Sequence, residues 1–196
     1  MFLRRIDESE AEGDAAAWYA SQRQAWGYLP NYAPAFATRG EVGLAWTNLN
    51  LTVRGGMDRR RFELVTTAAA RARRNTYCLA AHASFLRDVV GDEAAMRAVA
   101  LGDLERLDDV DRALIAFAAR IATDPAATRQ EDVDDLRALG LSDAEIADVV
   151  FAVAARLFFA TVLDATGALT DAQLGQTFPD DVRAGLTAGR PFAENS

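Results

Sequence analysis

The chain has 196 residues, a length that suits one domain, or one domain with a helical extension. Hydrophobic residues make up 51% of it, alanine is abundant, and proline and β-branched residues are sparse, a balance that favours helix over sheet. The formal net charge of −8, without a basic stripe, argues against nucleic acid as the main partner, because phosphate neutralisation dominates such binding.

Capping residues, glycine stops and apolar positions three and four residues apart predict a succession of helices. The predicted helices cover residues 14–26, 41–53, 58–74, 75–90, 92–101, 108–123, 128–139 and 142–165. Asp14 is the expected N-cap of the first helix, and Ser142 with Glu145 forms a capping box before the last. No alternating strand pattern is present, so we expect an all-α multi-helix bundle with a loose helical tail.

Aromatic residues crowd into the N-terminal part of the chain, around a turn-rich stretch. They are Trp18, Tyr19, Trp26, Tyr28 and Tyr32. These side chains either pack in a core and an interface, or form an aromatic wall over a substrate pocket.

The most apolar stretch runs from Ile146 to Leu163, and it is short for a membrane span and interrupted by Asp148 and Arg156. We therefore expect a buried core helix in which Arg156 pairs with an acidic group, since an unpaired charge there is costly. No apolar stretch follows the first seven residues as in a secretion signal, so we expect a cytoplasmic protein without a membrane partner. The apolar helix and the aromatic stretch together predict a homo-oligomer.

Several classes of site are excluded by the absence of their motifs. The sequence has no phosphate loop or dinucleotide fingerprint, and no nucleophile elbow accompanies its only histidine, His82. One cysteine, Cys78, and one histidine supply too few ligands for zinc, and a single cysteine forms no disulfide within the chain. We expect neither a metal nor a cofactor.

The chemistry that remains centres on Cys78. Asn75 is a good N-cap for the helix that follows it, and this places Cys78 in the first turn, where the helix dipole favours the thiolate. His82 lies four residues further on, on the same helix face, and an imidazole there can take the thiol proton. These features predict a reactive cysteine whose pKa lies below its reference value.

Glu63 belongs to the preceding predicted helix. If the two helices form an antiparallel hairpin, Glu63 lies roughly 6 Å along the axis from His82, at about 1.5 Å per residue. Glu63, His82 and Cys78 then form a proton relay. Each residue also has a structural interpretation: a small core cysteine, a hydrogen-bonded histidine and a glutamate that favours the helix start.

The same residues resemble the core motif of the alkylhydroperoxidase D and carboxymuconolactone decarboxylase superfamily. That motif is a Glu, eleven residues, a Cys, two residues, a second Cys, three residues and a His. Glu63, Cys78 and His82 occupy those places, while Asn75 stands at the first Cys and Tyr77 at the usual His before the second.

The segments 26–32 and 136–146 are similar to a branch of uncharacterised peroxidase-related proteins, and the resemblance covers roughly residues 14–172. It implies an all-helical bundle of the alkylhydroperoxidase D-like type, formed by one domain, and a homo-oligomer. The implied division of this single domain, 1–196, is an N-terminal helical extension 1–57, an alkylhydroperoxidase D-like core 58–172 and a C-terminal tail 173–196.

The resemblance also implies a peroxidase that uses a dithiol, of which this chain has only one half. With Asn75 at the first position, a sulfenic acid on Cys78 cannot close a disulfide within the chain, so an external thiol reductant or Cys78 of another subunit has to resolve it. Three functions stay open: a one-cysteine peroxidase that reduces a small hydroperoxide, a lactone or carboxylic-acid enzyme that uses His82 and Glu63 as acid and base on a small organic acid, and a non-catalytic helical binding protein.

Overall fold

A computed structural model describes residues 1–194 of the chain. Within these residues eleven α-helices form, joined by short 3₁₀ and π turns. The described part has no strand, and its one β-bridge pairs Thr170 with Phe192. The prediction of an all-α fold is confirmed.

The helices are, in chain order, α1 (Gly13–Trp26), α2 (Ala33–Ala37), α3 (Gly40–Gly55), α4 (Arg59–Ala72), α5 (Thr76–Phe85), α6 (Glu93–Leu101), α7 (Asp109–Thr123), α8 (Gln130–Ala138), α9 (Asp143–Thr166), α10 (Ala172–Gln176) and α11 (Asp180–Leu186).

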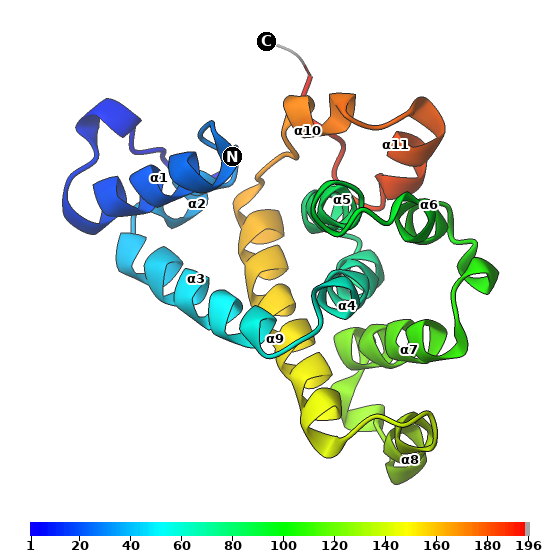
Figure 1. The fold of residues 1–196 in the computed structure, drawn as a ribbon. Coiled ribbons are helices and arrows are strands. Elements are labelled where there is room, and N and C mark those ends of the chain that lie inside the picture. Colours follow the sequence, from blue (N-terminus) through cyan, green and yellow to red (C-terminus); the bar gives the residue numbers. More distant parts are fainter. Residues whose placement is uncertain (195–196) are drawn as a thin grey trace.

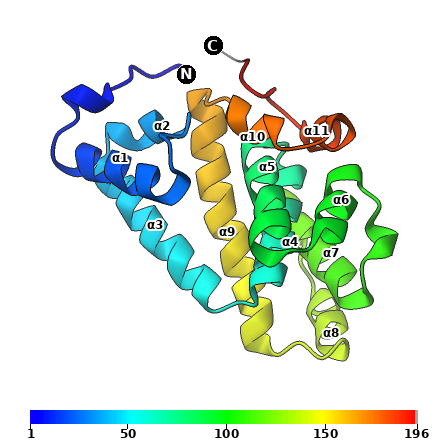
Figure 2. The same ribbon diagram turned by 45° about the horizontal axis from the view of Figure 1, so that its top comes forward.

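The long helix α9 runs through the middle of the molecule, with α1 to α3 on one side and α4 to α7 on the other (Figures 1 and 2). α4 packs against α5, α7 and α9, so it is the helix most enclosed by others. α5 follows α4 after a short turn and lies against it, as the predicted hairpin requires. The N-terminal helices α1 to α3 therefore meet the α4–α5 pair along a boundary beside α9, called the seam below.

The predicted N-caps of α5 and α9 are confirmed, because in both helices the side chain of the capping residue accepts a backbone hydrogen bond. Asn75 accepts a hydrogen bond from the backbone of Cys78, and Ser142 and Glu145 form the capping box of α9. The prediction for α1 is wrong, because this helix begins at Gly13 and Asp14 lies inside its first turn. The short helix α2 was not predicted, because its five residues follow a turn-rich stretch.

Close packing joins α1 to α3. At Gly43 an added Cβ would lie 2.7 Å from the ring of Trp18, which is nearer than side-chain atoms pack. Trp18 is fully buried, and its indole N–H donates to the carbonyl of Ala33 at 2.7 Å. A glycine at position 43 therefore allows the two N-terminal helices to approach and enclose this indole.

The C-terminal tail is packed rather than loose, so that prediction is wrong. Phe178, Val182 and Leu186 are spaced four residues apart and are buried on one side of α11 and the turn before it. The backbone N–H of Gly189 also donates to the hydroxyl of Thr76, in the first turn of α5, at 2.9 Å. The apolar spacing explains why the tail docks, since one face of α11 is hydrophobic.

α9 is long and apolar enough to cross a membrane, but half of its most apolar 18 residues are buried inside the protein. One face, with Ile146, Val153 and Leu163, lies in the core, as predicted. The opposite face exposes Phe151 and Phe158, whose relative exposures are 57% and 43%.

Candidate active site

A cavity of about 290 Å³ lies in the seam between the N-terminal helices and the α4–α5 pair. All three residues predicted for the site, Glu63, Cys78 and His82, line it. The aromatic part of the wall is Trp26, Tyr32, Trp46, Phe62, Tyr77, Phe85 and Phe159. The cavity is therefore largely apolar, with a few polar groups that converge on it, which is typical of small-molecule sites.

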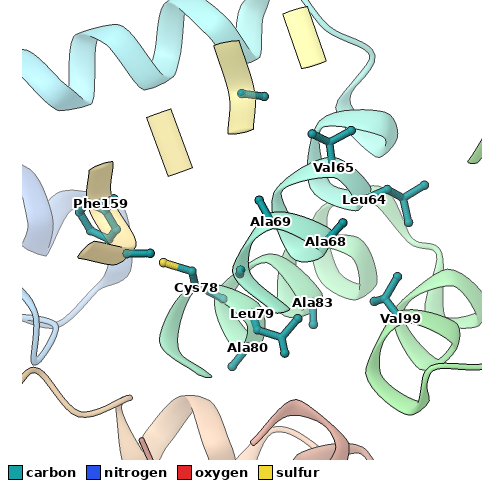
Figure 3. Close-up of a cluster of buried hydrophobic side chains, with 14 of the residues drawn as sticks. Leu64, Val65, Ala68, Ala69, Cys78, Leu79, Ala80, Ala83, Val99 and Phe159 are labelled. Atoms are coloured by element: carbon teal, nitrogen blue, oxygen red, sulfur yellow. The ribbon is translucent and has the colours of Figure 1, made fainter. Parts of the chain in front are cut away.

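The start of α5 fixes the position of Cys78. The side chain of Asn75 accepts from the backbone N–H of Cys78 at 2.7 Å and donates to the carbonyl of Ala160 on α9 at 3.4 Å. This cap orders the first turn of α5. In Figure 3 the sulfur of Cys78 points from α5 towards Phe159 on α9, while Leu79 points away from α9.

His82 is held by a carboxylate from the neighbouring helix. Its Nδ1 is hydrogen-bonded to Glu63, whose other carboxylate oxygen accepts from Arg59 Nε at 2.5 Å. Glu63 is fully buried, and His82 is 4% exposed. The side chain of Glu63 therefore joins a partly exposed guanidinium to a buried imidazole, and the predicted approach of Glu63 and His82 is confirmed.

Protonation in this pair follows from burial and from the neighbouring charges. Burial lowers the pKa of His82 to about 4, assisted by the charge of Arg156 and opposed by Glu63. Burial acts to raise the pKa of Glu63, but His82 and Arg59 outweigh it and hold that pKa below its ordinary value. At neutral pH, a neutral His82 thus donates its Nδ1–H to a carboxylate, which leaves Nε2 as an acceptor.

Arg156 of α9 is hydrogen-bonded to the thiol. Its Nη1 lies 3.7 Å from the sulfur of Cys78, and its Nη2 donates to the side-chain oxygen of Asn50 on α3 at 3.3 Å. The guanidinium carbon lies 5.6 Å from the centre of the Trp46 ring and 5.5 Å from that of Phe159. No carboxylate of the described residues pairs with Arg156, so the predicted acidic partner is wrong.

The expected low pKa of Cys78 is also wrong. The thiol is buried, which raises its pKa, and the charge of Arg156 opposes this effect only in part. Desolvation penalises the thiolate, and here it outweighs the position of Cys78 in a first helical turn. Cys78 is therefore a thiol at neutral pH, and no hydrogen bond joins it to His82 within the described residues.

A second polar network centres on Asp171. Tyr77, at the position of the usual motif histidine, donates its hydroxyl to Asp171, which also accepts from the Tyr28 hydroxyl at 3.1 Å and from the backbone N–H of Asn31 at 2.7 Å. Burial raises the pKa of Asp171, although these donors oppose it. Asp171 thus ties the turn between α1 and α2 to the segment that follows α9.

The aromatic N-terminal residues divide between the two interpretations left open by the sequence. Trp18 and Tyr19 are buried in the core. Trp26 and Tyr32 line the cavity, and the indole N–H of Trp26 donates to the hydroxyl of Tyr32 at 2.9 Å. That hydroxyl donates in turn to Gln22 at 2.5 Å.

The sequence identified the residues of α4 and α5 and missed those supplied from further away. Arg156 was recognised as a charged residue in an apolar helix, but nothing in the sequence connected it to Cys78. Asn50 and Trp46 of α3 carried no motif at all. Within residues 1–194, no group of three or more His, Cys, Asp or Glu residues is placed to hold a metal ion.

Comparison with known proteins relates this arrangement to others. Residues 40–101 match the carboxymuconolactone decarboxylase family. No protein of curated function matches the chain.

Solved structures share the fold. An uncharacterised peroxidase-related protein from Silicibacter sp. TM1040 has 21% identity and a TM-score of 0.77, over 89% of this chain and 92% of that one. An uncharacterised peroxidase-related protein from Ralstonia eutropha JMP134, described as an alkylhydroperoxidase AhpD core, has 19% identity and a TM-score of 0.79, over 88% and 93%. A variant of the debrominase Bmp8, in complex with 2,3,4-tribromopyrrole, has 18% identity and a TM-score of 0.72, over 95% and 96%.

At these identities the structural likeness establishes the fold alone, and the sequence match covers the helices α3 to α6 that carry Glu63, Cys78 and His82. Residues 40–101 are thus similar in sequence to the carboxymuconolactone decarboxylase family, and the chain as a whole has the alkylhydroperoxidase D-like core fold that the sequence predicted.

Proposed function

We propose that this protein is a thiol-dependent, peroxidase-like oxidoreductase that reduces a small organic hydroperoxide with Cys78. The observation that carries the proposal is that one cavity holds a thiol, a neutral imidazole held by a buried carboxylate, and a guanidinium 3.7 Å from the sulfur. These are a nucleophile, a proton carrier and a charge that stabilises developing thiolate.

The first step oxidises the sulfur by two electrons. Sulfur attacks the outer peroxide oxygen, an S–O bond forms as the O–O bond breaks, and the products are a sulfenic acid on Cys78 and an alcohol. Because burial raises the pKa of the thiol and lowers that of His82, neither free thiolate nor imidazolium accumulates. The thiol proton instead passes through His82 Nε2 to the departing alkoxide, which is a far stronger base than imidazole.

Glu63 acts in this step by fixing the proton of His82. Its carboxylate accepts from Nδ1, and this bond keeps Nε2 free of a proton before the reaction. Arg59 holds the other carboxylate oxygen, which leaves Glu63 only one orientation towards the imidazole. Glu63 is thus a positioning residue rather than a catalytic one.

The sulfenic acid is returned to the thiol by an external thiol reductant, since the chain has one cysteine. A first reductant molecule forms a mixed disulfide with Cys78 and releases water. A second attacks that disulfide, which restores the Cys78 thiol and releases the oxidised reductant. A small thiol fits this role best, because the sulfur is buried.

Sulfenic acid formation tests the proposal directly. Purified protein treated with cumene hydroperoxide in the presence of dimedone should form a dimedone adduct at Cys78, detected by mass spectrometry. Glu63→Gln should slow the formation of this adduct at least about tenfold. The Gln oxygen stays with Arg59 and its NH₂ faces Nδ1, and this moves the imidazole proton to Nε2.

Two controls complete the experiment. Cys78→Ser should abolish the adduct without loss of helical circular dichroism, since the substitution is nearly isosteric. Arg120→Gln, which removes an arginine from an ion pair with Asp132 outside the cavity, should leave the rate unchanged. Wild-type protein that forms no adduct, or a Glu63→Gln variant as fast as wild type, would contradict the mechanism.

A second candidate is an acid–base enzyme of the carboxymuconolactone decarboxylase type, in which Cys78 is passive. The observation that favours it is the protonation state, a neutral imidazole beside a carboxylate and an un-ionised thiol. In that case Cys78→Ser would keep most of the activity on a small lactone acid, whereas His82→Gln would lose it.

The homo-oligomer also remains a proposal, supported by the apolar residues that α3 and α9 leave exposed. These are Leu49, Leu51, Val150, Phe151 and Phe158. These large apolar side chains lie on two helices that pack together, and an association surface would remove them from water. Sedimentation at micromolar concentration should show more than a monomer, and replacing Phe151 and Phe158 by Ser should shift the protein to a monomer.

A further inference from the structure

We propose that the cavity binds a planar aromatic organic anion, and that Arg156 is the residue that recognises its charge. The inference deepens the proposed function, because it takes the cavity as the substrate site and names the class of molecule that fits it. It stands on the charge, the burial and the surroundings of Arg156.

The first argument is that Arg156 is buried without a carboxylate. The residue is 4% exposed, and its polar contacts are to a thiol and an amide, Cys78 and Asn50. Its Nε is buried and has no hydrogen-bond partner among residues 1–194. A buried guanidinium in this state is costly, and its unused donor lies on a residue that lines the cavity.

The second argument is the charge of the wall as a whole. In the described part of the chain, the cavity is lined by three arginines, Arg54, Arg59 and Arg156, and by one carboxylate, Glu63, which pairs with Arg59. Burial and the charge of Arg59 lower the pKa of Arg54, as crowded cations require. In a chain with a net charge of −8, this cavity carries uncompensated positive charge, which favours an anion.

The third argument is the shape of the wall around the guanidinium. Trp46 and Phe159 stack on each other with their ring centres 4.1 Å apart, and both lie beside Arg156. Trp26 and Phe85 form a second aromatic pair of the cavity wall, at 5.5 Å. An anion that carries an aromatic ring can satisfy Arg156 with its charge while its ring packs against these side chains.

Benzoate and its uncharged isostere benzamide test the proposal, by titration calorimetry on the reduced wild-type protein. Benzoate should bind at millimolar or lower concentration and at least about tenfold more tightly than benzamide, because only the carboxylate pairs with the guanidinium. Cyclohexanecarboxylate, which keeps the charge and loses the flat ring, should bind several-fold more weakly than benzoate. This comparison of ligands needs no variant.

Arg156→Gln should then reduce benzoate affinity at least about tenfold and leave benzamide affinity within about twofold. Arg120→Gln makes the same change of charge outside the cavity and should leave both affinities unchanged. No benzoate binding up to about 10 mM, equal binding of benzoate and benzamide, or full benzoate affinity in Arg156→Gln would each overturn the proposal. Equal binding of cyclohexanecarboxylate would refute its aromatic part.

The assay contains no peroxide and no reductant, so its outcome is independent of the redox chemistry. If the protein binds benzoate but forms no sulfenic acid, the anion-site proposal is supported and the peroxidase proposal fails. If it forms sulfenic acid but does not bind benzoate, the peroxidase proposal is supported and the anion-site proposal fails.

Discussion

Replacing His82 by Gln should remove most of the acid sensitivity of folding between pH 7 and pH 5. His82 is the only histidine of the chain and is buried with a pKa of about 4, against an ordinary value of 6.5. Between these values the unfolded chain binds a proton that the folded chain does not bind. The free energy of unfolding therefore falls as the pH falls through this window, and it is fully regained above 6.5.

The magnitude follows from the width of the window. At about 1.4 kcal/mol per pH unit, the roughly 1.5 units from 6.5 to 5 correspond to a loss of about 2 kcal/mol in the wild type that His82→Gln lacks. For a chain of this size that is a difference of about 4–8 °C in melting temperature. Carboxylates other than Glu63, whose pKa His82 helps to lower, titrate in both proteins, so their contributions largely cancel in the difference.

Urea unfolding at pH 7, 6 and 5, followed by far-ultraviolet circular dichroism, measures the two slopes. Proton NMR adds a direct check, because the wild type has a single imidazole whose C–H signal should not shift until well below pH 5. If the imidazole titrates well above pH 7, the pair with Glu63 is an imidazolium–carboxylate pair and the neutral His82 Nε2 assumed for the reaction is wrong. If it titrates near 6.5, or if the two slopes agree, the lowered pKa of His82 is wrong.

Two further predictions concern stability. Asp171→Ala should lower the free energy of unfolding by about 3 kcal/mol, because it leaves the buried hydroxyl of Tyr77 and a backbone N–H without their acceptor. Chemical denaturation measures this loss, and a loss below about 1 kcal/mol would contradict the role of this carboxylate. Gly43→Ala should lower the free energy of unfolding by roughly 1–3 kcal/mol, because the added methyl group overpacks against Trp18. The loss should appear as a lower melting temperature and an altered tryptophan emission. An unchanged melting temperature would show that α1 and α3 can separate freely.

The part of the site that could be predicted is the part built by local rules. The cap at Asn75 and the turn between two successive helices bring Glu63 to His82, although 19 residues separate them. Spacing along adjacent helices carries that information, because the rise per residue fixes which positions lie opposite.

The unpredicted part depends on packing between distant elements. Arg156 reaches Cys78 across 78 residues, and Asn50 meets Arg156 across 106. No local pattern encodes such pairs. The prediction for the pKa of Cys78 is wrong for the same reason. The first turn of a helix is visible in the sequence, whereas the burial that outweighs it arises only from tertiary packing.

The docked C-terminal segment has a consequence for the cavity. Gly189 bonds to Thr76 at the start of α5, the helix that carries Cys78, and α11 packs against α5 and α6. No residue of α11 lines the cavity, yet this helix braces the element that forms part of its wall. A substitution that loosens α11 would therefore also loosen the first turn of α5, and it would change the position of the sulfur from a distance.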